Sequence, residues 1–383
     1  MVSEQIEIAL RSVIGKGNIT LHEPSFDDKD TASLINCIKE GYVSSVGQSI
    51  EEFEGLLSKT TGAKFAVAMV NGTSALHLGL LCAGVEEGDE VLVPALTFVG
   101  SANAICHAGA TPHFIESESY SFGIDVVKLE DYLTRNTVIK NKCCWNIHTK
   151  KPIRAIMPVH IFGHIGMIVE LCELAKKYYL EVIEDAAEAL GSYKGQKHAG
   201  TFGKCGILSF NGNKIITTGG GGAVITDNEA LAKKVRHLSQ NAKVSHSFEY
   251  WHDEVGYNAR MPALNAALGI AQLHKLPKFL REKQKLTGAY ANAFEYIRVC
   301  QFFLPPKDCK SNNWLNAILL HEEYQHLLDK ILVDLNKNGL GCRPVWSLLS
   351  DLPHFNECPR MQIDISRSIA RRLINIPSSS FLG

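Results

Sequence analysis

The sequence lacks the features that mark a membrane protein or a nucleic-acid-binding protein. No uninterrupted apolar stretch approaches the ~20 residues that a helix needs to span a bilayer. The formal net charge is −1, from 39 basic and 40 acidic residues, and basic residues form no long run. Neither counterion release from nucleic acid nor attraction to anionic lipid is therefore expected. Residues 1–17 carry acidic side chains and no apolar core, unlike a secretory signal. These absences predict a cytoplasmic protein.

Cysteine pairs with the spacing of redox or zinc motifs are also absent. The eleven cysteines are dispersed, and Cys82 and Cys205 lie inside apolar segments, as expected of buried free thiols in a reducing compartment. The adjacent Cys143 and Cys144, with His148, form the one combination that could ligate a metal, but no second cluster accompanies them. No metal site is therefore predicted.

What the sequence does contain is a repeated alternation of short apolar runs with helical patterns. The runs are too short for helices and are bounded by turn residues; they cover residues 65–70, 90–94, 111–116, 154–160, 180–184, 205–210 and 222–226. Short buried strands that alternate with helices predict an α/β fold, with a mainly parallel seven-stranded sheet between layers of helices.

At 383 residues the chain is long for a single core, and two domains are expected. We predict an N-terminal helix and arm over residues 1–25, a large cofactor-binding domain over 26–276, and a smaller α/β domain over 277–383. Helical patterns on either side of Pro277 predict two separate helices between the domains. The polar residues 134–152 interrupt the pattern and predict an inserted loop or hairpin, at the surface or near a subunit contact.

Polar features directly follow several of the predicted strands, at the edge where parallel sheets gather their binding residues. Asp185 ends one strand and needs a cationic partner if it is buried, although it could instead cap a following helix. Asn71-Gly-Thr-Ser74 joins a strand to a helix, so its N–H groups and hydroxyls suit an anion such as a phosphate. An ordinary capped helix shows the same pattern.

Two further side chains complete the set. Phe98 follows another strand and either stacks on a flat ring or belongs to the core. Lys214 lies with Ser209 on an irregular segment that ends in four glycines, either as a reactive amine or as a solvated loop residue. A reactive lysine, a carboxylate such as Asp185, an anion cradle and an aromatic ring form the set that pyridoxal 5'-phosphate requires. On this interpretation the lysine forms a Schiff base and the carboxylate pairs with the pyridine nitrogen.

Three motifs resemble one known family, the DegT/DnrJ/EryC1/StrS sugar aminotransferases, which are pyridoxal phosphate enzymes of fold type I. The motifs are Val182-Ile-Glu-Asp-Ala-Ala-Glu-Ala-Leu-Gly191, Ser209-Phe-Asn-Gly-Asn-Lys214 and Gly256-Tyr-Asn-Ala-Arg-Met261. His22-Glu-Pro24, Val43-Ser-Ser-Val-Gly47 and the insertion are more similar to the aminotransferases of legionaminic acid and bacillosamine-type pathways. That subgroup aminates C4 of a UDP-linked 4-keto-6-deoxy-N-acetylhexosamine, usually with glutamate as the amino donor.

The resemblance also implies a role for each matching residue. Lys214 would hold the cofactor covalently and shuttle protons, and Asp185 would pair with the pyridine nitrogen. Phe98 would stack on the ring, while Asn258 would reach the phosphate of a neighbouring subunit, so that a homodimer shares its active sites. The phosphate would be bound by the remaining small residues, Gly72, Thr73, Ser74 and Ser209.

Glu188 lies where many relatives have Gln or His facing the phenolic oxygen of the cofactor. A carboxylate beside a phenolate is a like-charge pair, so one of them should hold a proton. The resemblance therefore predicts that Glu188 is protonated and donates to this oxygen, or that it turns away.

Three other functions are compatible with the same fold. Sugar dehydratases of the family have lost the lysine, whereas Lys214 is present here. A binding or regulatory protein without catalytic activity would not need Asp185. An enzyme that acts on amino acids alone should have an arginine for the α-carboxylate, and Arg260 and Arg343 remain open for that role.

Overall fold

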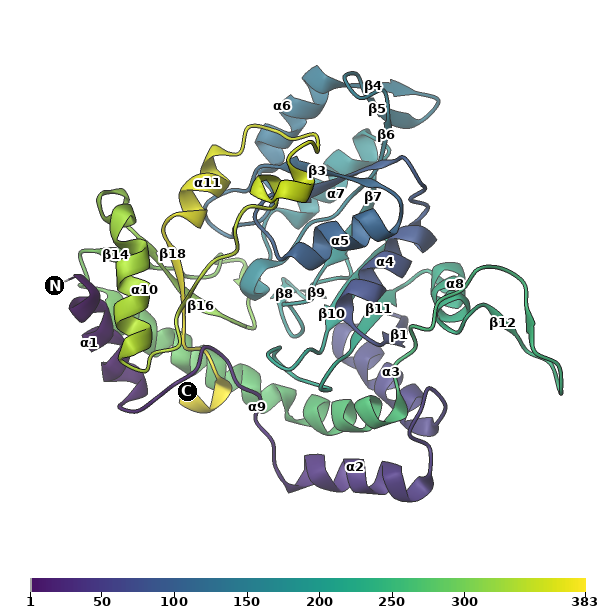
Figure 1. The fold of residues 1–383 in the computed structure, drawn as a ribbon, viewed down its shortest axis with the longest axis horizontal. Coiled ribbons are helices and arrows are strands. Elements are labelled where there is room, and N and C mark those ends of the chain that lie inside the picture. Colours follow the sequence, from purple (N-terminus) through teal and green to yellow (C-terminus); the bar gives the residue numbers. More distant parts are fainter. Residues whose placement is uncertain (1) are drawn as a thin grey trace.

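The computed structural model describes residues 2–383 and has two main sheets joined by a long helix (Figure 1). The larger sheet runs in the order β1-β11-β10-β7-β6-β2-β3. Every neighbouring pair from β10 to β3 is parallel, and β11 is antiparallel to both of its neighbours. The mainly parallel seven-stranded sheet is thereby confirmed. Its strands are β1 (Phe65–Met69), β2 (Glu90–Pro94), β3 (Thr111–Ile115), β6 (Pro152–Ile156), β7 (Glu181–Asp185), β10 (Cys205–Ser209) and β11 (Gly222–Thr226).

Helices cover both faces of this sheet. Alternate residues of a strand point to opposite faces, and here both sets are apolar and buried. In β1, Val67 and Met69 join one buried cluster, while Ala66 and Ala68 join another. The first cluster includes residues of α4 (Gly72–Ala83), α5 (Val99–His107) and α8 (Glu229–Ser239). The second includes residues of α3 (Gln48–Thr61), α6 (Val126–Asn136), α7 (Ile168–Lys177) and α9 (Ala263–Phe294).

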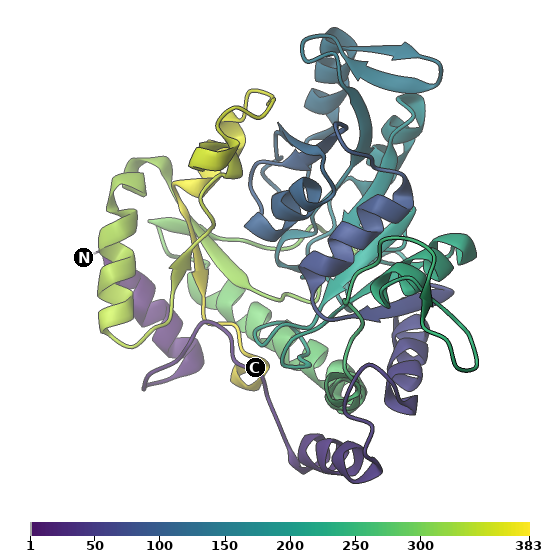
Figure 2. The same ribbon diagram turned by 45° about the vertical axis from the view of Figure 1, so that its right-hand side comes forward.

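The smaller sheet has the order β14-β16-β18-β17 and packs with helices at both ends of the chain (Figure 2). Ile6 and Leu10 of the first helix share a buried cluster with Tyr290 of α9 and Leu335 of α10. The N-terminal helix therefore packs on the C-terminal part of the chain. The elements are α1 (Val2–Ile14), β14 (Cys300–Phe302), β16 (Asn316–Leu320), α10 (Leu328–Lys337), β17 (Arg343–Pro344), α11 (Asp364–Ala370) and β18 (Leu373–Ile376).

One helix stands where two were expected. Helix α9 continues from Ala263 to Phe294 with Pro277 inside it. A proline inside a helix removes one hydrogen bond and costs about 3 kcal/mol. Here the helix buries residues on both sides of the proline, from Leu273 to Phe279 and beyond, so packing outweighs that cost. The expected domain boundary at residue 277 thus falls within a continuous helix.

Residues 134–152 contain a hairpin of β4 (Thr137–Lys140) and β5 (Cys143–Asn146), as one of the two predicted forms. Strand β5 pairs antiparallel with the first residues of β6, an interior strand, and this pairing attaches the hairpin to the main sheet. A buried polar network lies at the base of the hairpin. There Glu90 accepts hydrogen bonds from Asn146 Nδ2 and Thr149 Oγ1 and contacts His113 Nδ1 at 2.8 Å.

Two segments project from the body of the molecule (Figure 1). Helix α2 (Asp28–Glu40) packs on α9 but leaves Ile35 and Ile38 exposed. The pair β12 (Lys243–Val244) and β13 (Trp251–His252) extends away on the other side and carries further exposed aromatic residues. The remaining short strands, β8 (Tyr193–Lys194), β9 (Lys197–His198) and β15 (Cys309–Lys310), form a small sheet.

Candidate active site

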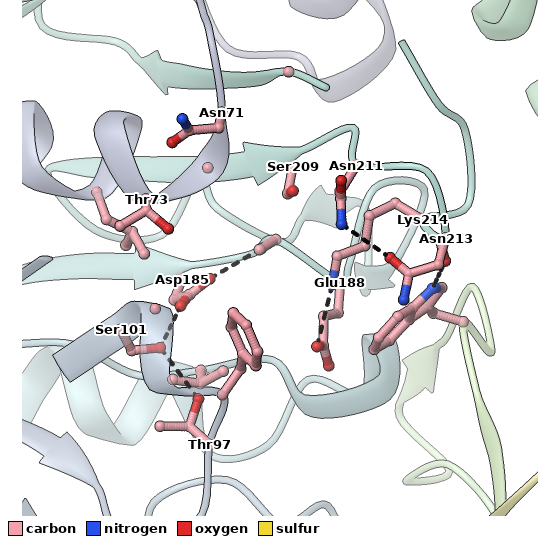
Figure 3. Close-up of a pocket in the computed structure, with 18 of the residues that line it drawn as sticks. Asn71, Thr73, Thr97, Ser101, Asp185, Glu188, Ser209, Asn211, Asn213 and Lys214 are labelled. Carbon is pink, nitrogen blue, oxygen red and sulfur yellow. Dashed lines mark hydrogen bonds and ion pairs between the residues drawn. The ribbon is translucent and has the colours of Figure 1, made fainter. Parts of the chain in front are cut away.

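A cavity of about 380 Å³ lies at the carboxyl ends of the parallel strands (Figure 3). It brings together residues from the ends of β1, β2, β7 and β10, which lie at one edge of the sheet because those strands run in the same direction. Seven of the predicted site residues line it: Gly72, Thr73, Phe98, Asp185, Glu188, Ser209 and Lys214.

Asp185 is buried and hydrogen-bonded on both carboxylate oxygens. Ser101 Oγ donates to Oδ2 at 2.7 Å, and the N–H of Ala187 donates to Oδ1 at 3.1 Å. Ser101 Oγ also lies 3.2 Å from Thr97 Oγ1. Burial raises the pKa of Asp185, while these hydrogen bonds and the charge of Lys214 oppose the rise. The alternative of a helix cap does not apply, because turns rather than a helix follow this residue.

Within residues 2–383, Asp185 makes no direct ion pair with a basic side chain. A buried carboxylate without a cation is costly, so the arrangement suits a ligand that brings a positive charge.

This burial has a consequence for stability. Because the folded pKa of Asp185 is raised, the contribution of this group to the free energy of unfolding is greatest at low pH and is lost as the pH rises through the folded pKa. We expect cofactor-free Asp185→Asn to be more stable than the parent at pH 7, by on the order of 1 kcal/mol. The difference should shrink towards pH 4. Urea unfolding at both pH values measures it; a less stable variant at pH 7 would show that the two hydrogen bonds outweigh burial.

The N-terminus of α4 forms the opposite wall together with Ser209. Asn71 caps the helix by accepting a hydrogen bond from the N–H of Ser74 at 2.7 Å. The first N–H groups of a helix have no partner within it, which favours an anion there. A Cβ at residue 72 would lie 3.1 Å from Ser209 Cβ, so glycine lets the serine approach the helix end. Ser74, whose N–H donates to Asn71, is not among the residues that line the cavity.

Phe98 is 54% exposed and lines the cavity, so the alternative of a core phenylalanine is wrong. It directly precedes α5, and its ring lies close to Gly100, where a Cβ would stand 3.1 Å from Phe98 Cδ1. The ring therefore borders open space on the cavity side, as a stacking residue should.

Lys214 points into the cavity and is largely buried (Figure 3). Its Nζ lies 3.3 Å from Glu188 Oε1 and 3.8 Å from the centroid of the Trp314 ring. The alternative of a solvated loop lysine is therefore wrong. Glu188 also accepts a hydrogen bond from the N–H of Phe162 at 2.9 Å. Burial raises the pKa of Glu188, and the charge of Lys214 opposes this rise.

The glycines after Lys214 allow close packing and tight turns of the backbone. A Cβ at residue 222 would stand 2.6 Å from the carbonyl carbon of Asn71, so Gly222 lets β11 pack against the chain entering α4. Gly219 has a φ of 81°, in the left-handed region that favours glycine. Gly220 and Gly221 do line the cavity.

Several lining residues were not predicted from the sequence. Ser101 follows Phe98 by three residues in the first turn of α5, so its position gave a usable signal. Trp314 and Trp346 come from the C-terminal part of the chain, and no local pattern connects them to the cavity. The other polar residues among them are Thr97, Asn211 and Asn213.

Other predicted or open residues lie elsewhere. Asn258 is exposed and pairs as an isolated bridge with Gln240 near the projecting β12–β13 segment. Arg260 and Arg343 are not among the residues that line the cavity. His148 Nε2 lies 2.9 Å from Asn136 Oδ1 rather than in a group with the two neighbouring cysteines.

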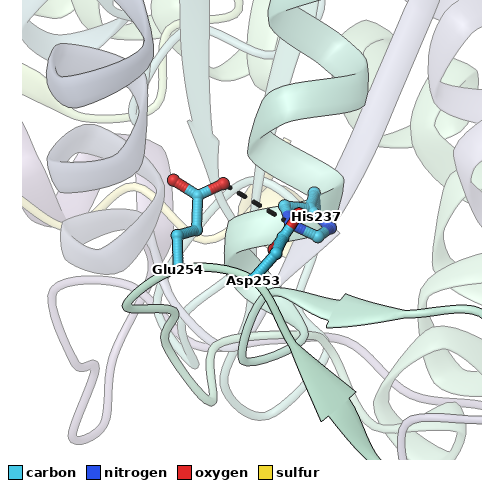
Figure 4. Close-up of side chains that lie close together, drawn as sticks. All are labelled: His237, Asp253 and Glu254. Atoms are coloured by element: carbon cyan, nitrogen blue, oxygen red, sulfur yellow. Dashed lines mark hydrogen bonds and ion pairs between the residues drawn. The ribbon is translucent and has the colours of Figure 1, made fainter.

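A separate cluster places His237 Nε2 2.7 Å from Asp253 and 3.4 Å from Glu254 (Figure 4). Lys234 Nζ also contacts Glu254, so basic and acidic groups already balance there. Both carboxylates are exposed.

The fold and the cavity define a pyridoxal phosphate enzyme of fold type I. Residues 24–383 match the DegT/DnrJ/EryC1/StrS aminotransferase family, and the chain belongs to it. The protein is a sugar aminotransferase that uses pyridoxal phosphate.

Relatives cover nearly the whole chain. GDP-perosamine synthase of Caulobacter vibrioides is 34% identical over 95% of this chain and 94% of its own. UDP-4-amino-4,6-dideoxy-N-acetyl-beta-L-altrosamine transaminase of Campylobacter jejuni is 34% identical over 84% of this chain and 82% of its own. The solved structure of Helicobacter pylori PseC, an aminotransferase involved in the biosynthesis of pseudoaminic acid, superposes with a TM-score of 0.86, 25% identity and coverage of 96% and 95%.

The cavity residues fit this cofactor. The capped end of α4 with Ser209 suits its phosphate, and the unpaired, buried carboxylate of Asp185 suits its protonated ring nitrogen. Lys214 offers the one lysine amine among the residues that line the cavity. In the part of the chain from Val2 onward, no helix is long and apolar enough to cross a membrane.

Proposed function

We propose that the protein aminates C4 of a UDP-linked 4-keto-6-deoxy-N-acetylhexosamine with glutamate as donor. Such a reaction would belong to the biosynthesis of a bacterial surface amino sugar, as in legionaminic acid pathways. The observation that carries the proposal is Lys214 beside Glu188 in one cavity with Asp185. The Campylobacter relative, named for a UDP-linked 4-amino-4,6-dideoxy sugar, supports the nucleotide and the position. The Caulobacter relative supports a GDP-linked sugar as the second candidate.

Each proposed residue has a physical task. Gly72, Thr73 and Ser209 would bind the phosphate, Phe98 would cover one ring face, and Asp185 would keep a proton on the ring nitrogen. When bound, pyridoxal phosphate supplies an electron sink and carries the amino group between donor and keto sugar. Lys214 would hold the cofactor covalently, and its Nζ would take up and return the proton at the reacting carbon as general base and acid.

An amination assay on UDP-, GDP- and dTDP-linked sugars with a 3-keto or 4-keto group tests the substrate. We expect the UDP-linked 4-keto-6-deoxy-N-acetylhexosamine to react with the highest kcat/KM and glutamate to be consumed in equal amount. A higher kcat/KM with the GDP-linked 4-keto sugar would replace the UDP proposal by its alternative. The absence of amination with every sugar would contradict both.

We further propose a homodimer with shared active sites. The region between α8 and α9 exposes four large apolar side chains beside Asn258, and α2 adds Ile35 and Ile38. Apolar surface of this kind is typical of an interface. The four residues are Phe248, Tyr250, Trp251 and Val255.

Subunit mixing tests the shared site. Lys214→Ala and Asn258→Ala should each lose most activity alone. If Asn258 serves the neighbouring subunit, a mixed dimer has one intact site, and a reassorted mixture should recover about a quarter of parent activity. Recovery of none, while mixed dimers are present by mass spectrometry, would place both residues in the same subunit's site.

The division into residues 1–25, 26–276 and 277–383 remains a proposal, and so does a cytoplasmic location. The location is supported by the state of the cysteines, because all eleven are free in the structure.

A further inference from the structure

The amine of Lys214 is held on two sides by groups of the protein itself. One side is the carboxylate of Glu188, with Oε1 3.3 Å from Nζ. The other side is the face of the Trp314 ring, whose centroid lies 3.8 Å from Nζ. An ammonium group over an indole face and beside a carboxylate is stabilised by both contacts, and more strongly where water is excluded.

Trp314 is fixed in place by three hydrogen bonds. Its backbone N–H donates to Phe162 O at 3.0 Å and to Asn312 Oδ1 at 2.9 Å. Its indole Nε1–H donates to Asn213 O at 2.6 Å. The indole therefore anchors the residue that precedes Lys214, while its ring face meets the amine. The side chain is 4% exposed, which leaves it little freedom to move.

Glu188 is held by the same part of the structure. Its Oε2 accepts the N–H of Phe162, a residue with a φ of 56° in the left-handed region. A side chain other than glycine adopts that region rarely, and such strain gathers at functional sites. The next residue, Gly163, must be glycine, because a Cβ there would lie 1.9 Å from Asn312 Oδ1.

Asn312 links the two holding groups. Its Nδ2 donates to Glu188 O at 2.8 Å and to Leu190 O at 2.9 Å, while its Oδ1 accepts from Trp314. The ring and the carboxylate are thus positioned relative to each other by one buried side chain.

We propose that Trp314 and Glu188 form a holding site for the free amine of Lys214, with Trp314 as a positioning residue. The side chain of a free lysine has four rotatable bonds, so its amine has no fixed orientation unless the protein supplies contacts. The holding site keeps Nζ in the cavity during the part of the cycle in which the amine is not attached to the cofactor. The inference rests on the proposed role of Lys214, but it concerns the amine and not the identity of the sugar.

Amine labelling of the cofactor-free protein provides a readout independent of turnover. A limiting dose of acetic anhydride, followed by peptide mass spectrometry, gives the labelling rate of Lys214 relative to the exposed Lys140. We expect Trp314→Leu, which removes the ring, to raise the relative rate about tenfold. Trp314→Phe keeps a ring face and should stay within about twofold of the parent. Equal labelling in the parent and Trp314→Leu would overturn the proposal.

Kinetic measurements distinguish a residue that positions Lys214 from one that contacts the substrate. With Trp314→Leu we expect kcat for both half-reactions to fall about tenfold while KM for donor and sugar stays near the parent value. A raised KM for the sugar with unchanged kcat and unchanged labelling would make Trp314 a substrate contact instead. Should Trp314→Leu fail to fold, Glu188→Gln takes its place, because it keeps the shape and removes the charge. It too should raise the labelling rate.

The holding site and the proposed function can each be wrong without the other. If no keto sugar is aminated but Trp314→Leu still exposes Lys214 to labelling, the proposed function is wrong and the holding site stands. If amination proceeds and labelling does not respond to either variant, the holding site is wrong and the proposed function stands.

Discussion

Lys214→Ala is expected to purify without covalently attached cofactor and to lose at least about four orders of magnitude in kcat. In the proposed function two tasks depend on this amine, covalent attachment and proton transfer, and no other lysine lines the cavity among residues 2–383. The absorbance spectrum of the purified variant and a single-turnover assay with glutamate measure the two losses.

Lys214→Arg is the matched control. It keeps a positive charge beside Glu188 and Trp314 but cannot form the covalent bond or release a proton near neutral pH. If the lysine served only to balance the charge of Glu188, the arginine variant would retain activity. Retained turnover in either variant would contradict the assignment of Lys214.

Asp185→Asn is expected to lower kcat by about 10² to 10³-fold while keeping the shape of the cavity. The carboxylate supplies a fixed negative charge where a protonated ring nitrogen would lie, and an amide supplies none. Cofactor affinity should fall as well, because the buried positive charge loses its partner. Steady-state kinetics and equilibrium dialysis of the cofactor measure the two effects.

Ser101→Ala controls for orientation. It removes the hydroxyl that donates to Asp185 Oδ2 but leaves the charge, so the loss in kcat should be about tenfold or less. A loss as large as that of Asp185→Asn would mean that geometry, and not charge, is the main contribution of this carboxylate. Asp185→Asn is also expected to be the more stable protein without cofactor at pH 7, so activity and stability should change in opposite directions.

Much of the site could be predicted because its residues follow strand ends that are near one another by topology. Asp185, Ser209 and the start of α4 each come directly after a buried run, and parallel strands bring such ends to one edge. The role of Glu188 was inferred from the family resemblance alone, and the cavity brings this residue together with Gly72, Thr73 and Phe98.

Trp314 could not be predicted, because its place in the cavity depends on long-range packing. It precedes β16 of the second sheet and is positioned beside Lys214 by hydrogen bonds with Phe162, Asn312 and Asn213. The course of α9 past Pro277 is another long-range effect, since local propensity favours a break and burial on both sides outweighs it. Ile35 and Ile38 show the converse, because an apolar pattern on α2 stays exposed in this structure.

Helix α9 limits how the two cores can move relative to each other when substrate enters. Its 32 residues form a helix about 48 Å long that packs against the main sheet at one end and the smaller sheet at the other. A continuous helix leaves no flexible linker at residue 277 about which the two cores could rotate freely. Entry of a sugar nucleotide is therefore expected to leave the two cores at a fixed spacing.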